Sequence, residues 1–144
     1  GTASSDIVEL LGLNLHKAVV LSVVREDMVI SNAEAAYRPY NPRSYAYCSD
    51  TAPFPELAGW VRGASVLYHE ATFPAEMAEM AEKTFHSTTL QAAQCALDAG
   101  VGRLLVGHYS SRFPSVEFYL DELRSVFPES YLTKDMDEIE ISFE

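Results

Sequence analysis

The sequence predicts a soluble domain of the α/β class. Short apolar runs rich in β-branched and aromatic residues alternate along the chain with longer segments of helical periodicity. The 144 residues are 48% hydrophobic and 22% charged, a balance typical of globular domains and not of disordered chains. A chain of this size buries roughly 68–70% of its unfolded surface, enough for one core. Because no repeat or long linker divides the sequence, we expect a single domain over residues 1–144.

The composition also indicates the cellular compartment. No apolar run approaches the ~20 residues of a membrane span, and no secretory leader is visible. The opening residues 1–5 lack an initiator Met and resemble a tag remnant or a cut within a longer protein. Cys48 and Cys95 are too few for a disulfide framework, and both lie in apolar surroundings that favour buried, reduced thiols. We expect a cytoplasmic protein without membrane association.

The charge argues against direct binding of nucleic acid. The formal net charge is −11, from 21 acidic and 10 basic residues. Binding to a phosphate backbone depends on Lys and Arg releasing counterions. If the chain acts on nucleic acid, metal ions or another segment must supply the positive charge.

The elements before Ser44 are weakly defined. Residues 18–24 form a β-branched apolar run that predicts a strand, and a second short apolar run covers 28–30. Residues 36–43 contain two prolines and an Asn, which predict a loop. Its alternating aromatic and basic side chains suit either a lip that faces substrate or tyrosines packed on the rim of the core.

From Ser44 onward, strands and helices alternate regularly. Strands are predicted at 45–49, 64–68, 103–107 and 139–143, and helices at 55–61, 75–83, 87–99 and 116–126. The helix at 87–99 is the clearest, because Ser87 or Thr88 can cap its start and Gly100 suits a left-handed stop. Its predicted apolar face consists of Leu90, Ala93, Ala96 and Leu97.

Three of the predicted strands end in ionisable residues. Asp50 follows the first strand, Glu70 the second and His108 the third. A fourth residue, His86, stands just before the helix at 87–99. Ligand sites in layered α/β folds gather at the ends of strands. We therefore expect these four side chains to converge at one edge of the sheet.

The chemistry of this set has two interpretations. Two carboxylates and two imidazoles together have the composition of a metal or an acid–base site. Taken singly, an Asp after a strand is often a turn former, Glu70 could cap the next segment, and a strand-end histidine is often a hydrogen-bonded residue at the core rim. The spacing alone predicts a hydrolytic or metal site and does not identify the reaction.

Four successive motifs resemble those of ribonuclease Z, the metallo-β-lactamase-fold endonuclease that trims the 3′ ends of precursor tRNA. They are Tyr47–Thr51, Leu67–Phe73, His86–Ala93 and Ala99–Phe113. The blocks His-Glu-Ala-Thr and His-Ser-Thr are the distinctive parts, whereas the Asp-Thr and Gly-His blocks occur throughout the superfamily. The resemblance runs from about Tyr45 to the C-terminus, and residues 1–43 match no motif.

The resemblance implies roles for individual residues. Asp50 matches a carboxylate that bridges two zinc ions, and His108 matches a terminal zinc ligand. His86 matches the histidine that assists phosphodiester cleavage, and Glu70 the acid that orients it and keeps it protonated as a proton donor. Ser110 and Arg112 lie where the family closes around the substrate phosphate. Zinc-bound water would supply the nucleophile at neutral pH.

The sequence also departs from the family. It contains neither the His-x-His-x-Asp-His motif of the N-terminal half nor the protruding arm that grips tRNA. The resemblance therefore implies the C-terminal half of a metallo-β-lactamase-type αββα sandwich, with one mixed sheet flanked by helices. One face of that sheet would lack its partner, so we expect a homodimer. With only two ligands, the chain should bind zinc weakly and be inactive alone.

Two other functions fit the same residues. A phosphodiesterase of the same superfamily could act on small molecules, and a basic arm in the complete protein would decide for tRNA instead. A non-catalytic assembly domain is the other alternative, which a degraded His-x-His-x-Asp-His motif in the complete protein would favour.

Overall fold

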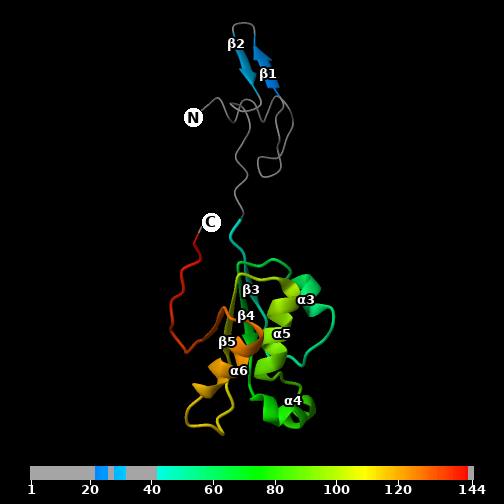
Figure 1. The fold of residues 1–144 in the computed structure, drawn as a ribbon, viewed down its shortest axis with the longest axis vertical. Coiled ribbons are helices and arrows are strands. Elements are labelled where there is room, and N and C mark those ends of the chain that lie inside the picture. The colour runs from blue at the N-terminus through cyan, green and yellow to red at the C-terminus, as the bar shows by residue number, and fades with distance from the viewer. Residues whose placement is uncertain (1–21, 26–27, 32–41, 143–144) are drawn as a thin grey trace. The chain divides into compact units, whose positions relative to one another are not determined.

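The computed structural model describes residues 22–25, 28–31 and 42–142 of the chain (Figure 1). Two compact units are present, residues 1–42 together with Glu144, and residues 43–143, here called the C-terminal unit. Each is described by itself. The boundary coincides with the start of the recognisable motifs, and the single-domain organisation stays a prediction.

The described part of the first unit is an antiparallel pair of strands. β1 (Ser22–Arg25) pairs with β2 (Met28–Ser31), with Val23 opposite Ile30. The strand predicted at 18–24 is thus found in part, since residues 18–21 lie outside the described residues. The loop predicted at 36–43 lies outside them up to residue 41.

The C-terminal unit is built on a four-stranded sheet. Its strands lie in the order β3 (Tyr45–Tyr47), β4 (Val66–Glu70), β5 (Arg103–Gly107) and β6 (Ser130–Leu132). The α/β class is confirmed, but all four strands are parallel where a mixed sheet was expected. Parallel strands need long crossover connections, and helices supply them here.

Helices cover one face of this sheet. α5 (Thr89–Ala99) and α6 (Phe118–Val126) pack against the strands, and α3 (Leu57–Trp60) packs on α5. The 3-10 turn η1 (Ala75–Met77) and α4 (Ala78–Thr84) lie between β4 and α5 in the chain. α5 is central, because it packs against β4, β5, α3 and α6 (Figure 1). Every helix predicted after Ser44 is present, with ends shifted by a few residues. No helix within the described ranges is both long and apolar enough to cross a membrane.

Helix α5 confirms its predicted ends and corrects its predicted face. Thr88 and Gln91 form a reciprocal capping box, and Gly100 ends the helix in the left-handed conformation. Leu90 and Leu97, however, are 37% and 50% exposed. The buried face consists of Thr89, Ala92, Ala93, Ala96 and Ala99. Small side chains suit this face because the helix lies between the sheet and two other helices.

The last strand was predicted in the wrong place. Residues 139–142 are irregular, and their carbonyls accept hydrogen bonds from arginine side chains instead of a neighbouring strand: Arg103 reaches Glu140 at 2.6 Å and Arg43 reaches Ile141 at 2.9 Å. The fourth strand is β6, which the sequence analysis missed. Only three residues long and close behind Pro128, it shows little alternation to detect.

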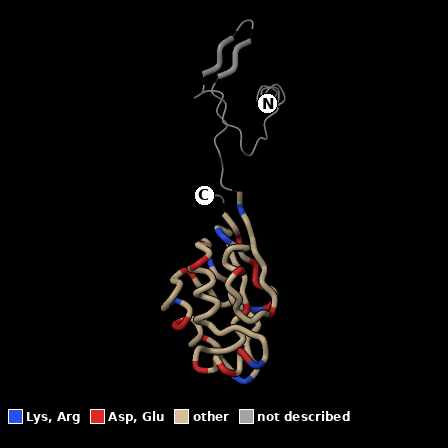
Figure 2. Tube along the Cα trace, turned by 90° about the vertical axis from the view of Figure 1, so that its right-hand side faces the viewer, with Lys and Arg blue, Asp and Glu red and all other residues tan. Residues whose placement is uncertain are grey.

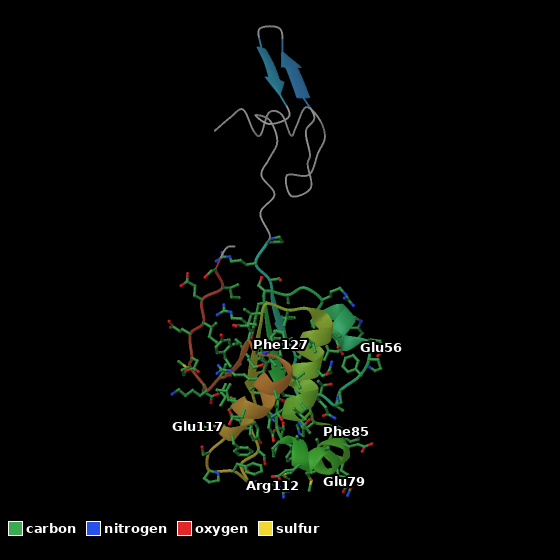
Figure 3. The ribbon with its side chains drawn as sticks, in the orientation of Figure 1. Glu56, Glu79, Phe85, Arg112, Glu117 and Phe127 are labelled. Atoms are coloured by element: carbon green, nitrogen blue, oxygen red, sulfur yellow. The ribbon has the colours of Figure 1, made fainter. Side chains whose placement is uncertain are left out.

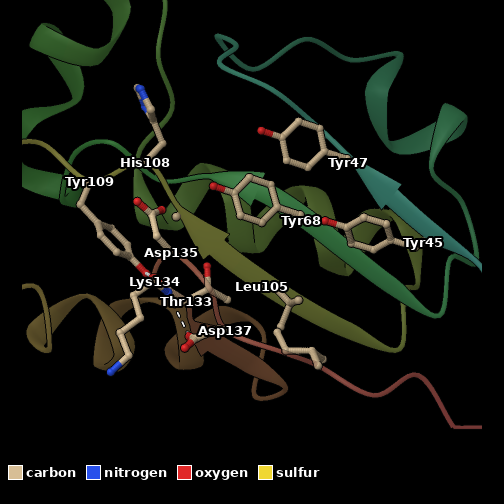
Figure 4. Close-up of a pocket in the computed structure, with 12 residues that line it drawn as sticks. Tyr45, Tyr47, Tyr68, Leu105, His108, Tyr109, Thr133, Lys134, Asp135 and Asp137 are labelled. Carbon is tan, nitrogen blue, oxygen red and sulfur yellow. Dashed lines mark hydrogen bonds between the residues drawn. The ribbon is translucent and has the colours of Figure 1, made fainter.

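The other face of the sheet carries tyrosines and no helix among the described residues. Ala46 of β3 packs against the core, so its neighbours Tyr45 and Tyr47 project to the opposite side and are 53% and 64% exposed. Tyr68 of β4 stacks on Tyr47 with ring centroids 4.8 Å apart. Figure 4 shows these rings side by side on the sheet. Val66 and Leu105 lie on this same face and are buried, so the face is covered in part, and its lack of a partner stays a prediction.

Candidate functional site

The parallel sheet brings the four predicted site residues to one edge. Glu70 is the last residue of β4 and lies opposite Gly107, the last residue of β5, so that His108 follows directly beside it. Asp50 lies three residues beyond β3, and His86 lies two residues before the capping residue of α5. The structure thus places all four residues in one network of contacts.

Three of these side chains form a possible metal site. One ligand atom from each of Asp50, His86 and His108 can be chosen such that all lie within 4.8 Å of one another. His108 Nε2 lies 3.2 Å from Asp50 Oδ2, and both side chains are about half exposed, at 45% and 50%. Two ligands of a tetrahedral zinc ion with bonds of about 2.0–2.1 Å are roughly 3.3 Å apart. The donor set and this separation therefore fit a metal ion.

Glu70 is the buried carboxylate at this edge of the sheet, and its neighbours are hydrogen-bonded to it. Its Oε1 accepts hydrogen bonds from the Thr51 N–H at 3.0 Å and from His86 Nδ1 at 2.8 Å. Its Oε2 accepts from the Thr72 N–H at 3.0 Å and from the Thr72 hydroxyl at 2.6 Å. Burial by itself would raise the pKa of Glu70, but the hydrogen bonds from Thr72, His86 and the Ser87 backbone together lower it below the ordinary 4.5. Glu70 is therefore a carboxylate fixed in one orientation.

His86 lies between this carboxylate and the exposed edge. Its ring is held through Nδ1 by Glu70, and it lies against the ring of His108 with centroids 5.2 Å apart. Phe73 packs edge-on against it at 6.2 Å. The side chain is 21% exposed. A half-buried imidazole with one nitrogen on a carboxylate is an arrangement that can transfer a proton through the other nitrogen.

Thr72 connects the two halves of the site, and the sequence analysis gave it no role. Its hydroxyl lies 2.6 Å from Glu70 Oε2, 2.9 Å from His108 Nδ1 and 3.3 Å from His86 Nδ1. Its carbonyl accepts hydrogen bonds from the Tyr119 hydroxyl and the Ser110 N–H, both at 2.9 Å. The sequence signal that could have indicated this role is the position of Thr72 two residues after Glu70. At the end of a strand the backbone turns, and a hydroxyl at that position can contact the Glu70 carboxylate.

His108 is aimed by an unusual backbone. Its φ of 60° lies in the left-handed region, which costs a non-glycine residue roughly 1–2 kcal/mol. The residue before it, Gly107, has no room for a side chain, since a Cβ there would collide with the Tyr68 hydroxyl. Strained backbone of this kind often marks functional sites.

The remaining predicted residues lie at the rim. The Ser110 hydroxyl accepts a hydrogen bond from the Arg112 N–H at 3.3 Å, and Arg112 is exposed. Figure 3 shows Arg112 at the same end of the C-terminal unit as Phe85, the residue before His86. Binding of substrate phosphate by Ser110 and Arg112 stays a prediction.

His69 is not part of the possible metal site. It is buried, and its Nδ1 lies 2.7 Å from the Glu70 carbonyl. Burial lowers the pKa of His69, against a smaller opposing effect of Glu70. The histidine beside Glu70 is thus a core residue whose charged form is disfavoured by burial.

A groove of about 700 Å³ opens beside the site on the tyrosine-bearing face (Figure 4). His108 and Tyr109 line one part of it, and Tyr45 and Ile139 line another. Charged side chains of the C-terminal segment, Lys134 among them, complete its wall. A substrate or a second polypeptide could reach His108 from this side.

Comparisons with known proteins confirm the resemblance. The chain is 42% identical over 113 residues to a ribonuclease Z of Bacteroides fragilis (strain YCH46), which covers 78% of this chain and 37% of the relative. It is 51% identical over 86 residues to a ribonuclease Z of Porphyromonas gingivalis (strain W83), covering 60% of this chain and 28% of the relative. The chain thus matches 37% of the length of the first relative and 28% of the second. No protein-family model matches it.

Solved structures confirm the fold. Human tRNase Z, short form, matches with a TM-score of 0.56 and 24% identity, over 69% of this chain and 34% of that one. The metallo-beta-lactamase fold protein YhfI of Bacillus subtilis matches with a TM-score of 0.58 and 23% identity, over 62% and 36% of the two chains. The C-terminal unit therefore has the architecture of part of a metallo-β-lactamase fold.

Proposed function

We propose that these residues form part of a zinc-dependent endoribonuclease that removes the 3′ trailer of precursor tRNA. The observation that carries the proposal is the cluster of Asp50, Glu70, His86 and His108 at one sheet edge, in a chain 42% identical over 113 residues to a ribonuclease Z. The similarity to ribonuclease Z indicates the reaction. The geometry supplies a metal-compatible donor set beside a carboxylate–imidazole pair.

The contacts support separate roles for the four residues. Asp50 and His108 would hold zinc, because their facing atoms are 3.2 Å apart and open to solvent. When bound, the metal centre would supply activated water and stabilise charge on the phosphate. His86 would donate a proton to the leaving oxygen, since Glu70 holds its Nδ1 and leaves Nε2 free for transfer. Glu70 positions His86 and takes no direct part.

A complete two-zinc site needs more ligands than this chain offers. The sequence contains no His-x-His-x-Asp-His motif, and the described C-terminal unit brings together three candidate ligand side chains, of which we assign His86 to proton transfer. We propose that further ligands come from protein outside these 144 residues. The chain by itself should then bind zinc weakly and leave precursor tRNA uncut.

The acidity of the chain fits this division of labour. Asp and Glu residues, red in Figure 2, outnumber Lys and Arg over the described unit. Carboxylates suit the surroundings of a dinuclear cation centre, but they repel a phosphate backbone. We propose that the basic surface for tRNA lies on the complementary part of the enzyme.

We also propose a homodimer and a cytoplasmic location. The tyrosine-bearing face of the sheet has no helix over it among the described residues, and a second copy could cover it through a two-fold axis. Cys48 and Cys95 are free thiols, as reducing compartments favour.

A chimera tests the function. Residues 43–144 would replace the corresponding segment of the Bacteroides fragilis ribonuclease Z, and cleavage of a 3′-extended precursor tRNA would be followed with zinc present. We expect cleavage by the chimera, none by the 144-residue chain, and loss of cleavage in chimeras with Asp50→Ala or His86→Ala. Cleavage that persists in both variants, or a folded, zinc-loaded chimera without activity, would contradict the proposal.

A further inference from the structure

The Thr72 hydroxyl has more partners than protons. It can donate one hydrogen bond and accept two. Its shortest contact, 2.6 Å, is to Glu70 Oε2. That oxygen already accepts from the Thr72 N–H, and the other carboxylate oxygen accepts from the Thr51 N–H. Glu70 therefore acts as an acceptor on both sides, and the Thr72 proton must point toward it.

This assignment decides the proton on His108. Thr72 Oγ1 lies 2.9 Å from His108 Nδ1 and has no second proton to give. The contact is a hydrogen bond only if Nδ1 carries the proton and the hydroxyl accepts it. His86 must also carry a proton on Nδ1, because this nitrogen lies 2.8 Å from Glu70 Oε1, which can only accept a hydrogen bond. Both imidazoles then carry their proton on Nδ1 and leave Nε2 free when neutral.

Asp50 lies on the other side of the His108 ring and favours the opposite tautomer. Its Oδ2 lies 3.2 Å from His108 Nε2 and would favour a proton there. That contact joins two half-exposed groups, so solvent can take the place of either partner. Losing the contact therefore costs only about 0–1 kcal/mol. Thr72 is buried, and a lone pair on Nδ1 would place two acceptors against each other at this contact, which is costly for a buried group. The buried contact therefore decides the tautomer.

We infer that Thr72 is a positioning residue that fixes the Nδ1–H tautomer of His108 and so presents Nε2, beside Asp50 Oδ2, to a metal ion. Through its hydroxyl, Thr72 connects the buried Glu70 carboxylate, which already holds His86, to a second imidazole, that of His108. Histidine ligands elsewhere are held by such outer hydrogen bonds, whose loss costs 10–100-fold in metal affinity. The inference deepens the proposed function and rests on it for the ligand role of His108, although the tautomer itself does not.

The test reads ring nitrogens by ¹⁵N NMR in the metal-free 144-residue chain. The spectra are recorded over a pH series that reaches the neutral form of each ring, in which the two tautomers can be distinguished. We expect Nδ1–H at His108 in the wild type and a shift toward Nε2–H in Thr72→Val, where only Asp50 still acts. Thr72→Ser keeps the hydroxyl and should restore Nδ1–H. Thr84→Val, which alters an exposed threonine at the end of α4, is the matched control.

Zinc binding gives the second measurement, with zinc chloride titrated into the same four proteins. We expect Thr72→Val to bind zinc 10–100-fold more weakly than the wild type, and Thr72→Ser and Thr84→Val within about threefold of it. An Nε2–H tautomer in the wild type overturns the inference even if Thr72→Val fails to fold, and so does an unchanged tautomer in a folded Thr72→Val. If the Nδ1–H tautomer is present but no zinc binds, the tautomer assignment stands and the expected weak zinc binding by Asp50 and His108 of this chain fails.

Discussion

Replacing Glu70 by Gln removes a charge and one acceptor from a buried position. The buried carboxylate accepts four hydrogen bonds, two at each oxygen. A glutamine keeps one acceptor oxygen and turns an NH₂ group toward either the Thr51 N–H or the Thr72 N–H. At least one buried backbone donor is then unpaired, which costs about 1–3 kcal/mol. The hydrogen bonds that remain lose the charged acceptor and about half their strength. We expect Glu70→Gln to lower the free energy of unfolding by about 3 kcal/mol.

Urea unfolding at pH 7, followed by far-UV circular dichroism, measures this difference. For a unit of about 100 residues, 3 kcal/mol corresponds to a fall in Tm of roughly 12–24 °C. Glu82→Gln, on the exposed surface of α4, is the matched control and should stay within about 0.5 kcal/mol of the wild type. A Glu70→Gln variant as stable as this control would refute the reasoning.

The same variant predicts a pH dependence. Because the folded-state pKa of Glu70 is lowered from its ordinary 4.5, its charge contributes stability above that pH, and the contribution is lost as the pH falls through the folded value. The stability difference between wild type and Glu70→Gln should therefore be constant near neutral pH and shrink below about pH 4.5. A difference that does not change down to the acid unfolding of both proteins would contradict the lowered pKa.

Three further outcomes are expected. In the chimera, Asp50→Ala should weaken both zinc binding and cleavage, whereas His86→Ala should reduce cleavage about 10²–10⁴-fold with little loss of zinc; equal zinc loss in the two variants, measured by calorimetry, would make His86 a ligand. Light scattering of the 144-residue chain should give a dimer that Tyr47→Lys converts to monomer, with Glu82→Lys as control; a wild-type monomer at high concentration would exclude the dimer. Gly102→Ala should destabilise by about 1–3 kcal/mol in urea, because its Cβ would lie 2.6 Å from the Ser65 carbonyl oxygen, whereas Gly59→Ala, with open space around it, should not destabilise.

Patterns of residues close in sequence predicted most helices and strands and the sheet edge that carries the candidate site. The capping box of α5 and its terminal Gly100 involve residues close in sequence, so their chemistry could be identified without the fold. The convergence of Asp50, Glu70 and His108 was predicted because each follows a predicted strand and ligand sites of layered α/β folds gather at strand ends. The all-parallel order that brings these ends to one edge was not predicted, since a mixed sheet was expected. Both features depend on short-range patterns.

Features set by tertiary packing could not be predicted in this way. Leu90 and Leu97 fit an apolar face by periodicity, yet the alanines of α5 face the sheet because the available space is narrow. β6 is a strand only because β5 offers it an open edge. Thr72 contacts side chains 14 and 36 residues away, and neither contact leaves a trace in the sequence around it.

The all-parallel sheet has a consequence for how the C-terminal unit folds. Its strand pairs join residues far apart in the chain: Tyr45 with Val66, Val66 with Arg103, and Leu104 with Ser130. No pair can close as a hairpin, so each pairing must first overcome the entropy of closing a loop of 20 residues or more. Contacts of this separation slow folding and leave strand edges exposed to other chains in the meantime. The topology that gathers the candidate site residues at one edge thus also makes the unit slow to fold and prone to aggregate before it does.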